Sequence, residues 1–169
     1  MTGKAKFEVA RNAMLLSPRL KAEFQDAVNA FTTSVEYAER VKSESETQKE
    51  SEVLNMWYAR RRRLQPLSVD LRRFVELGWE SEIVLGLDAH AYVSETVALF
   101  RKQYGELSSA IDSYFDIKRQ EAISGELDHE QEWLRELKRV IYQHPNSDFL
   151  KEIDDSTTKL ASALKAYVK

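Results

Sequence analysis

A chain of 169 residues, 43% of them apolar and 31% charged, can bury a hydrophobic core and has the balance of a globular protein. The net charge of −3 argues against a dedicated nucleic-acid binder, which usually carries a basic excess. The absence of cysteine excludes disulfides, thiolate zinc sites and a cysteine nucleophile. Because the sequence has neither a membrane-length apolar run nor a leader of signal-peptide type, we expect a cytoplasmic protein without a membrane anchor.

The dipeptide Ser17-Pro18 predicts the start of a first long helix, because serine caps free N–H groups and proline fits the first helical position. Apolar and small residues then recur every three or four positions, which is typical of a buried helical face. We therefore expect a helix from 18 into the forties, with a short peripheral helix within 1–16. The stripe consists of Leu20, Phe24, Ala27, Phe31, Ser34, Ala38 and Val41, and it is widened by Val28 and Val35.

The segment 43–52, SESETQKESE, contains no apolar residue, so we expect the first helix to project beyond the core there before the chain turns. A second long helix is predicted over 53–79. Pro66 removes a backbone hydrogen bond and clashes with the carbonyl four residues earlier, which predicts either a kink or two helices that meet near 65. Residues 80–86 are expected to form a connector.

The most regular stripe predicts a third long helix over 89–123, with Asp88 as its N-cap and Ser124-Gly125 as its end. Gly105 lies inside this helix and costs about 1 kcal/mol relative to alanine, yet the stripe continues across it. A fourth helix over about 127–143 follows and is expected to bury Trp133, Leu137, Val140 and Ile141, and Ser147 caps a fifth helix. The third stripe consists of Val93, Val97, Phe100, Tyr104, Leu107, Ile111 and Tyr114.

Together these elements predict an all-α fold. Long helices with apolar residues at alternating spacings of three and four pack at shallow angles. We expect an elongated antiparallel bundle of about five helices in a single domain over 1–169. Three of the helices are long, two shorter ones are C-terminal, and one is kinked by proline.

A metal site is not expected. Di-iron carboxylate bundles carry a Glu-x-x-His pair on each of two helices. Glu126 and His129 supply one such pair, in an acidic stretch at a predicted helix start, but Leu87 and Ile141 stand three residues before the other two histidines. We therefore interpret 126–129 as a solvated helix start and predict neither a metal nor another cofactor.

One spacing is compatible with nuclease chemistry. Arg139 and His144 are separated by four residues near a predicted helix end, and this resembles the Arg-x4–6-His pattern of HEPN-type ribonucleases. In that resemblance the histidine would act as acid or base and the arginine would stabilise charge on the phosphate. Val140 stands where the family usually has a polar residue, and His144 also fits a helix C-terminus.

The arginine run at 60–63 is followed by two more arginines at 72 and 73. Successive helical residues lie 100° apart, so four consecutive arginines spread over about 300° and cannot share one face. Arg60 falls within the apolar stripe of its helix, where a guanidinium needs a partner, whereas Arg62 points outward. We expect that partner to be a carboxylate of the acidic segment 126–136, which holds Glu126, Asp128, Glu130, Glu132 and Glu136.

No nucleophile motif or glycine-rich phosphate loop is present, so the sequence favours a non-enzymatic helical bundle that acts through protein–protein contacts. Its partner would be another protein or further copies of the chain in a homo-oligomer. Two alternatives stay open. One is a HEPN-like ribonuclease that uses Arg139 and His144. The other is an arginine-lined surface, drawing on Arg60, Arg61 and Arg72, that binds an acidic or phosphorylated partner.

Overall fold

Helices form the architecture of the part of the chain that the computed structural model describes, residues 3–125 and 131–169. They make up 84% of these residues, which include no β-strand, and this confirms the predicted all-α bundle. None of the described helices is both long enough and apolar enough to span a bilayer. The elements in chain order are α1 (Gly3–Val28), the 3₁₀ helix η1 (Ser34–Tyr37), α2 (Gln48–Val84), α3 (Leu87–Ser124), α4 (Gln131–Ile141), α5 (Asp148–Leu164) and the 3₁₀ helix η2 (Lys165–Tyr167).

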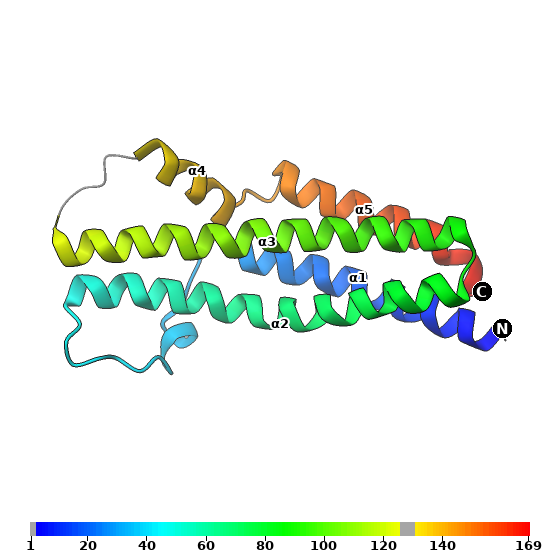
Figure 1. Ribbon diagram of the computed structural model, residues 1–169, viewed down its shortest axis with the longest axis horizontal. Helices are drawn as coiled ribbons and strands as arrows, with labels where there is room; N and C mark the ends of the chain where they lie inside the picture. Colours follow the sequence, from blue (N-terminus) through cyan, green and yellow to red (C-terminus); the bar gives the residue numbers. More distant parts are fainter. Residues whose placement is uncertain (1–2, 126–130) are drawn as a thin grey trace.

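The two longest helices, α2 and α3, run antiparallel along the length of the molecule (Figure 1). α1 packs against α2 and α5, and α5 packs against α3, so four helices surround the core in the half that holds both chain ends. In the other half, α4 packs against α3 and η1 packs against α2. The α2–α3 hairpin therefore extends beyond the end of α1.

An aromatic cluster fills the core where these four helices meet. Phe24 of α1 lies 5.6 Å, centroid to centroid, from Phe100 of α3, which lies at the same distance from Phe74 of α2. Phe149 of α5 completes the cluster at 6.0 Å from Phe24. Tilted and edge-on rings of this kind add to the free energy of apolar burial.

The first helix differs from the prediction at both ends. α1 begins at Gly3 and continues through Ser17 and Pro18, so the expected helix start there is wrong. Its buried residues form one stripe across the proline, and burying that stripe outweighs the missing hydrogen bond. The helix ends at Val28 rather than in the forties. The buried stripe consists of Val9, Ala10, Ala13, Ser17, Leu20, Phe24, Ala27 and Val28.

The second helix is longer than expected. The projecting helix end predicted over 43–52 is wrong, because this stretch is a loop up to Thr47, whose side chain accepts a hydrogen bond from the N–H of Glu50 and caps α2. The helix continues unbroken through Pro66, which excludes two separate helices meeting near 65. It ends at Val84, so most of the expected connector over 80–86 is helical.

The third and fifth helices match the prediction closely. α3 ends at Ser124 and is capped by Gly125, whose φ of 71° is the left-handed conformation that glycine adopts without strain. Gly86, rather than Asp88, is its N-cap, and Asp88 lies in the first turn. Ser147 caps α5 by accepting a hydrogen bond from the N–H of Leu150 at 3.3 Å.

The fourth helix departs from the prediction in its bounds and in one buried residue. α4 ends at Ile141, two residues before the expected end, and the described part of it begins at Gln131. Trp133 was expected in the core but is about half exposed, whereas its neighbour Leu134 is buried. The predicted segment 127–130 lies outside the described residues.

Candidate functional site

Arg60 is the largest side chain that the fold buries completely, with 1% of its surface exposed. Its Nη1 donates hydrogen bonds to the carbonyls of Ala27 and Asn29, and its Nη2 donates to the carbonyl of Ala30. The ring of Tyr142 lies 4.5 Å from the guanidinium carbon. Burial lowers the pKa of Arg60 to about 10, so the group stays charged at neutral pH. A cation therefore caps the negative end of α1.

We expected a carboxylate of the segment 126–136 to pair with Arg60. That prediction is wrong for the acidic residues of this segment that the structure describes. Both terminal nitrogens of its guanidinium are occupied by backbone carbonyls, and Glu36 is the carboxylate whose charge raises its pKa. Glu136 pairs with Arg139 instead. Of the remaining members of 126–136, Glu126, Asp128 and Glu130 lie outside the described residues.

Arg63 fastens the chain that follows α1. It forms two hydrogen bonds with the Glu36 carboxylate, at 2.8 and 2.9 Å, and these lower the pKa of Glu36. Arg62 is more exposed and reaches nearby carbonyls only at 3.4 Å. We call Arg60, Arg63 and Glu36 the arginine clasp. The carbonyls that accept from Arg63 are those of Asp26, Asn29 and Phe31.

A second set of contacts fixes the far end of the same connection. Arg40 forms a two-point ion pair with Glu46, at 3.0 and 2.9 Å, and donates to the side-chain oxygen of Asn55 at 2.8 Å. Ser51 donates to Glu46 at 2.8 Å. Hydrogen bonding to Arg40 lowers the pKa of Glu46 to about 2. Both ends of the segment between α1 and α2 are therefore attached to α2.

The segment held in this way, residues 29–47, is called the clasped loop below. Three large apolar side chains on it point into solvent: Phe31 is 83% exposed, Val35 73% and Val41 90%. Phe31 and Val41 belong to the predicted stripe and Val35 widens it. All three were therefore expected to be buried in a longer first helix. That expectation is wrong for all three.

The two flanking arginines of the run do not form one site. Arg61 reaches across to α3, where it donates to Ser108 at 2.8 Å and lies 3.6 Å from Asp112. Arg72 is exposed and stands eleven residues further along α2, about 16 Å away along the helix axis. Arg60 points to the opposite neighbour, α1. The structure therefore does not bring Arg60, Arg61 and Arg72 together.

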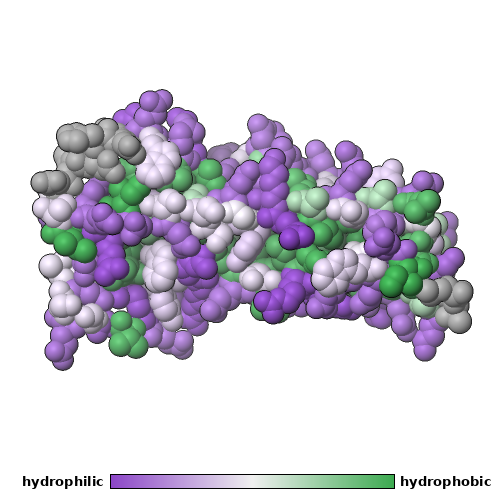
Figure 2. Space-filling view, in the orientation of Figure 1, coloured by the Kyte–Doolittle hydropathy of each residue, from purple (hydrophilic) through white to green (hydrophobic). Residues whose placement is uncertain are grey.

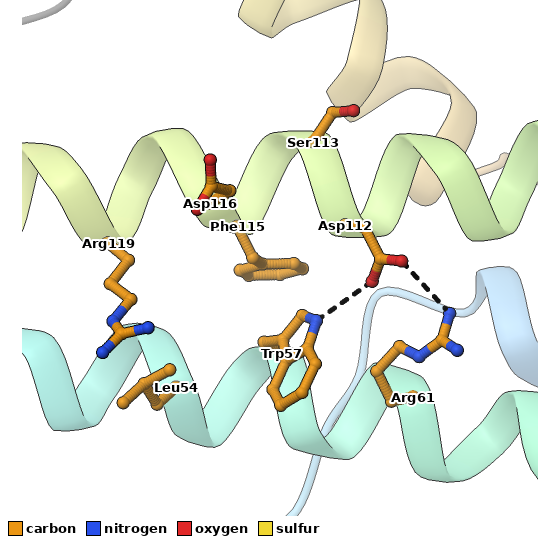
Figure 3. Close-up of a pocket in the computed structure, with 8 residues that line it drawn as sticks. All are labelled: Leu54, Trp57, Arg61, Asp112, Ser113, Phe115, Asp116 and Arg119. Atoms are coloured by element: carbon orange, nitrogen blue, oxygen red, sulfur yellow. Dashed lines mark hydrogen bonds and ion pairs between the residues drawn. The ribbon is translucent and has the colours of Figure 1, made fainter.

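A cleft of about 550 Å³ opens between α2 and α3 beside Arg61. Trp57 forms its floor and donates from Nε1 to Asp112 at 3.1 Å, and Arg61 approaches the other oxygen of the same carboxylate (Figure 3). The cleft thus combines aromatic surface with charges of both signs. Its lining residues are Leu54, Trp57, Arg61, Asp112, Ser113, Phe115, Asp116 and Arg119.

Arg139 and His144 have separate surroundings. Arg139 is exposed on α4 and pairs with Glu136 one turn earlier, toward the start of the helix. His144 lies beyond the helix end, where its Nδ1 accepts from the N–H of Asn146 at 3.1 Å. No hydrogen bond joins the two side chains within the described part of the chain. Phosphodiester cleavage by this pair would need both side chains in one site.

Ser81 and His90 form a hydrogen-bonded pair that sequence reasoning missed. The Ser81 hydroxyl lies 2.9 Å from His90 Nδ1, but it donates its proton to the carbonyl of Gly78 at 2.7 Å. The imidazole N–H must then donate to the serine oxygen. Because Ser81 is also fully buried, the pair joins α2 to α3 and does not resemble an activated nucleophile.

A second overlooked cluster holds two carboxylates between α1 and α2. Burial raises the pKa of Glu23 to about 7, and hydrogen bonding to Asp70 and its negative charge add to the effect. Arg19 lies 2.8 Å from Asp70 and 3.5 Å from Glu23. The sequence did hold a signal for Asp70, because it stands three residues after Leu67, within the buried stripe of α2.

Residues 3–125 and 131–169 contain no group of three or more side chains that could hold a metal ion. The half-motif of Glu126 and His129 lies outside these residues. No family model, curated protein or solved structure matches this chain. The function is therefore inferred from the geometry of the described residues.

Proposed function

We propose that this protein is a non-enzymatic interaction module that binds a partner protein through the clasped loop. The observation that carries the proposal is the exposure of Phe31, Val35 and Val41 on a segment that is held in one conformation from both ends. Exposed apolar surface that is gathered on one ordered segment is typical of protein contacts.

The length of the connection supports this proposal. Two antiparallel helices such as α1 and α2 need only about 2–8 residues between them, whereas this chain uses 29–47. Ordering each additional residue costs about 1–2 kcal/mol in backbone entropy. The clasp and the pair of Arg40 and Glu46 offset that cost, and a connector with no other role would not require them.

The other candidate functions receive less support. The nuclease alternative needs Arg139 and His144 in one cleft, and their contacts lie apart. An acidic or phosphorylated ligand would need free arginines that converge, but Arg60 and Arg61 are occupied within the protein. Arg72 alone is a weak anion site in water.

The proposal is tested with a photo-crosslinking amino acid placed at Val35 or Val41 in the native host. Leu15 serves as the control position, because it is 60% exposed on α1, away from the clasped loop. We expect one identical protein adduct from both loop positions and none of it from position 15. Loosening the loop with Arg63→Met should abolish the adduct. Equal labelling at position 15, or different adducts at the two loop positions, would refute the proposal.

A further inference from the structure

One long face of α3 lies at the surface of the protomer, and only Ser108 and Asp112 on it bond to side chains of α2 within the described residues. Its buried stripe packs onto α2, α5 and α4, and a second stripe, about 150° away around the helix, remains at the surface. In Figure 2 pale and green surface lies between purple groups along the middle of the molecule, where α2 and α3 run side by side. We call this second stripe the outer face of α3. It consists of Ala98, Arg101, Gly105, Ser108, Ser109, Asp112 and Asp116.

The charges of the outer face are arranged so that it complements itself. Arg101 and Asp116 are both exposed, and neither makes an ion pair or hydrogen bond within residues 3–125 and 131–169. They stand fifteen residues apart, about 22 Å along the axis, and differ by only about 60° around the helix. The small residues Ser108 and Ser109 lie midway between them.

We infer that the outer face of α3 is the site of self-association, in which a second copy of this chain packs antiparallel against it around a two-fold axis between Ser108 and Ser109. A two-fold axis at that point places Arg101 of each copy opposite Asp116 of the other, so that two ion pairs form at once. An isologous contact requires this kind of self-complementarity. The inference does not depend on the clasped loop, which lies at the outer side of α2.

No contact inside the protomer requires a glycine at position 105. A Cβ at this position would meet no atom within 4 Å, so no neighbour inside the protein requires glycine there. A helix-interior glycine nevertheless costs about 1 kcal/mol relative to alanine. In the antiparallel pair Gly105 faces Asp112 of the second copy, next to the axis, where the lack of a side chain lets the two helices approach closely.

The area available is sufficient for a stable dimer. The axis falls near the middle of α3, so residues 93–124 of both copies overlap, over about 48 Å. The α2–α3 pair is about 20 Å wide, which allows roughly 900 Å² per protomer to be covered, against about 800 Å² in a typical specific interface. The cleft above Trp57 lies within this overlap and would be closed by the second copy.

A charge-reversal experiment tests the pairing. Sedimentation equilibrium at low salt should show a dimer for the native chain, and either Arg101→Glu or Asp116→Arg alone should weaken dimerisation by about 30-fold or more. Mixing the two variants restores both opposite-charge pairs, so a heterodimer should form. Circular dichroism checks that each variant is folded. A native chain that stays monomeric at several hundred micromolar, or variants that dimerise as well as the native chain, would overturn the inference.

The absence of native cysteine allows a second, independent measurement. Ser109→Cys lies beside the proposed axis and should form an intermolecular disulfide rapidly under mild oxidation. Ala98→Cys is the matched control, because in the antiparallel pair the two copies of position 98 stand about 31 Å apart. Equal disulfide formation at the two positions would overturn the proposed register, and preferential formation at position 109 would support it.

Discussion

Replacement of Arg60 by methionine tests whether this buried arginine holds the end of α1 in place. The variant keeps the length of the side chain but leaves the carbonyls of Ala27, Asn29 and Ala30 without their donors. Each lost charge-assisted hydrogen bond costs about 1.5 kcal/mol, and the contact with Tyr142 contributes about 1 kcal/mol. Relief of the desolvation of a buried cation returns about 2 kcal/mol. The expected net loss in the free energy of unfolding is about 3.5 kcal/mol.

Arg62→Met is the matched control, two residues away on the same helix. Arg62 is exposed and its contacts are long, so the same substitution there should cost less than about 0.5 kcal/mol. Urea denaturation followed by circular dichroism gives both values, provided that the slopes with denaturant agree. The reasoning is refuted if Arg60→Met costs no more than Arg62→Met.

Three further predictions concern Glu23, the clasped loop and two glycines. The pKa of Glu23 is raised from 4.5 in the unfolded chain to about 7, so its ionisation destabilises the fold progressively between those pH values. Glu23→Gln should therefore leave stability nearly unchanged at pH 4.5 and increase it at pH 8 by up to about 3 kcal/mol, and an increase at the lower pH instead would contradict this. Arg63→Met should speed tryptic cleavage after Lys42, in the clasped loop, by about tenfold or more without loss of global helicity, because local opening becomes easier; an unchanged cleavage rate would show that the clasp does not order the loop. Replacement of glycine by alanine should have opposite signs at two positions, stabilising by about 0.5–1 kcal/mol at Gly105, where space is open, and destabilising by about 1 kcal/mol at Gly125, where φ is positive. Thermal unfolding of dilute samples measures this pair, and equal signs would contradict it.

The sequence was sufficient for helices whose ends carry local signals. Ser147 and Gly125 mark helix ends through their own backbone preferences, and the stripes of α3 and α5 needed no knowledge of their neighbours. Local signals were misleading at Ser17 and Pro18, because these two residues usually begin a helix but here lie inside one. The local signal there is worth a few kcal/mol at most. Burial of residues on both sides of the proline against α2 and α5 outweighs it.

The sequence predicted where Arg60 lies but not which groups it binds. Helical geometry correctly placed Arg60 on the core side of its helix, and it correctly pointed Arg62 outward. Backbone carbonyls are the actual partners of Arg60, and every residue type carries one, so they leave no trace in the composition of a segment. The search for an acidic residue therefore led to 126–136 instead of the end of α1.

The arginine run also explains why the first helix stops where the stripe continues. In a longer helix the carbonyls of Asn29, Ala30 and Phe31 would accept from N–H groups four residues later. In the fold they accept from Arg60 and Arg63 instead, so the two arginines satisfy carbonyls that a longer helix would have paired. The apolar residues beyond Val28 are consequently withheld from the core and displayed on the clasped loop. The same arginines that terminate α1 thus create the surface that we propose for partner binding.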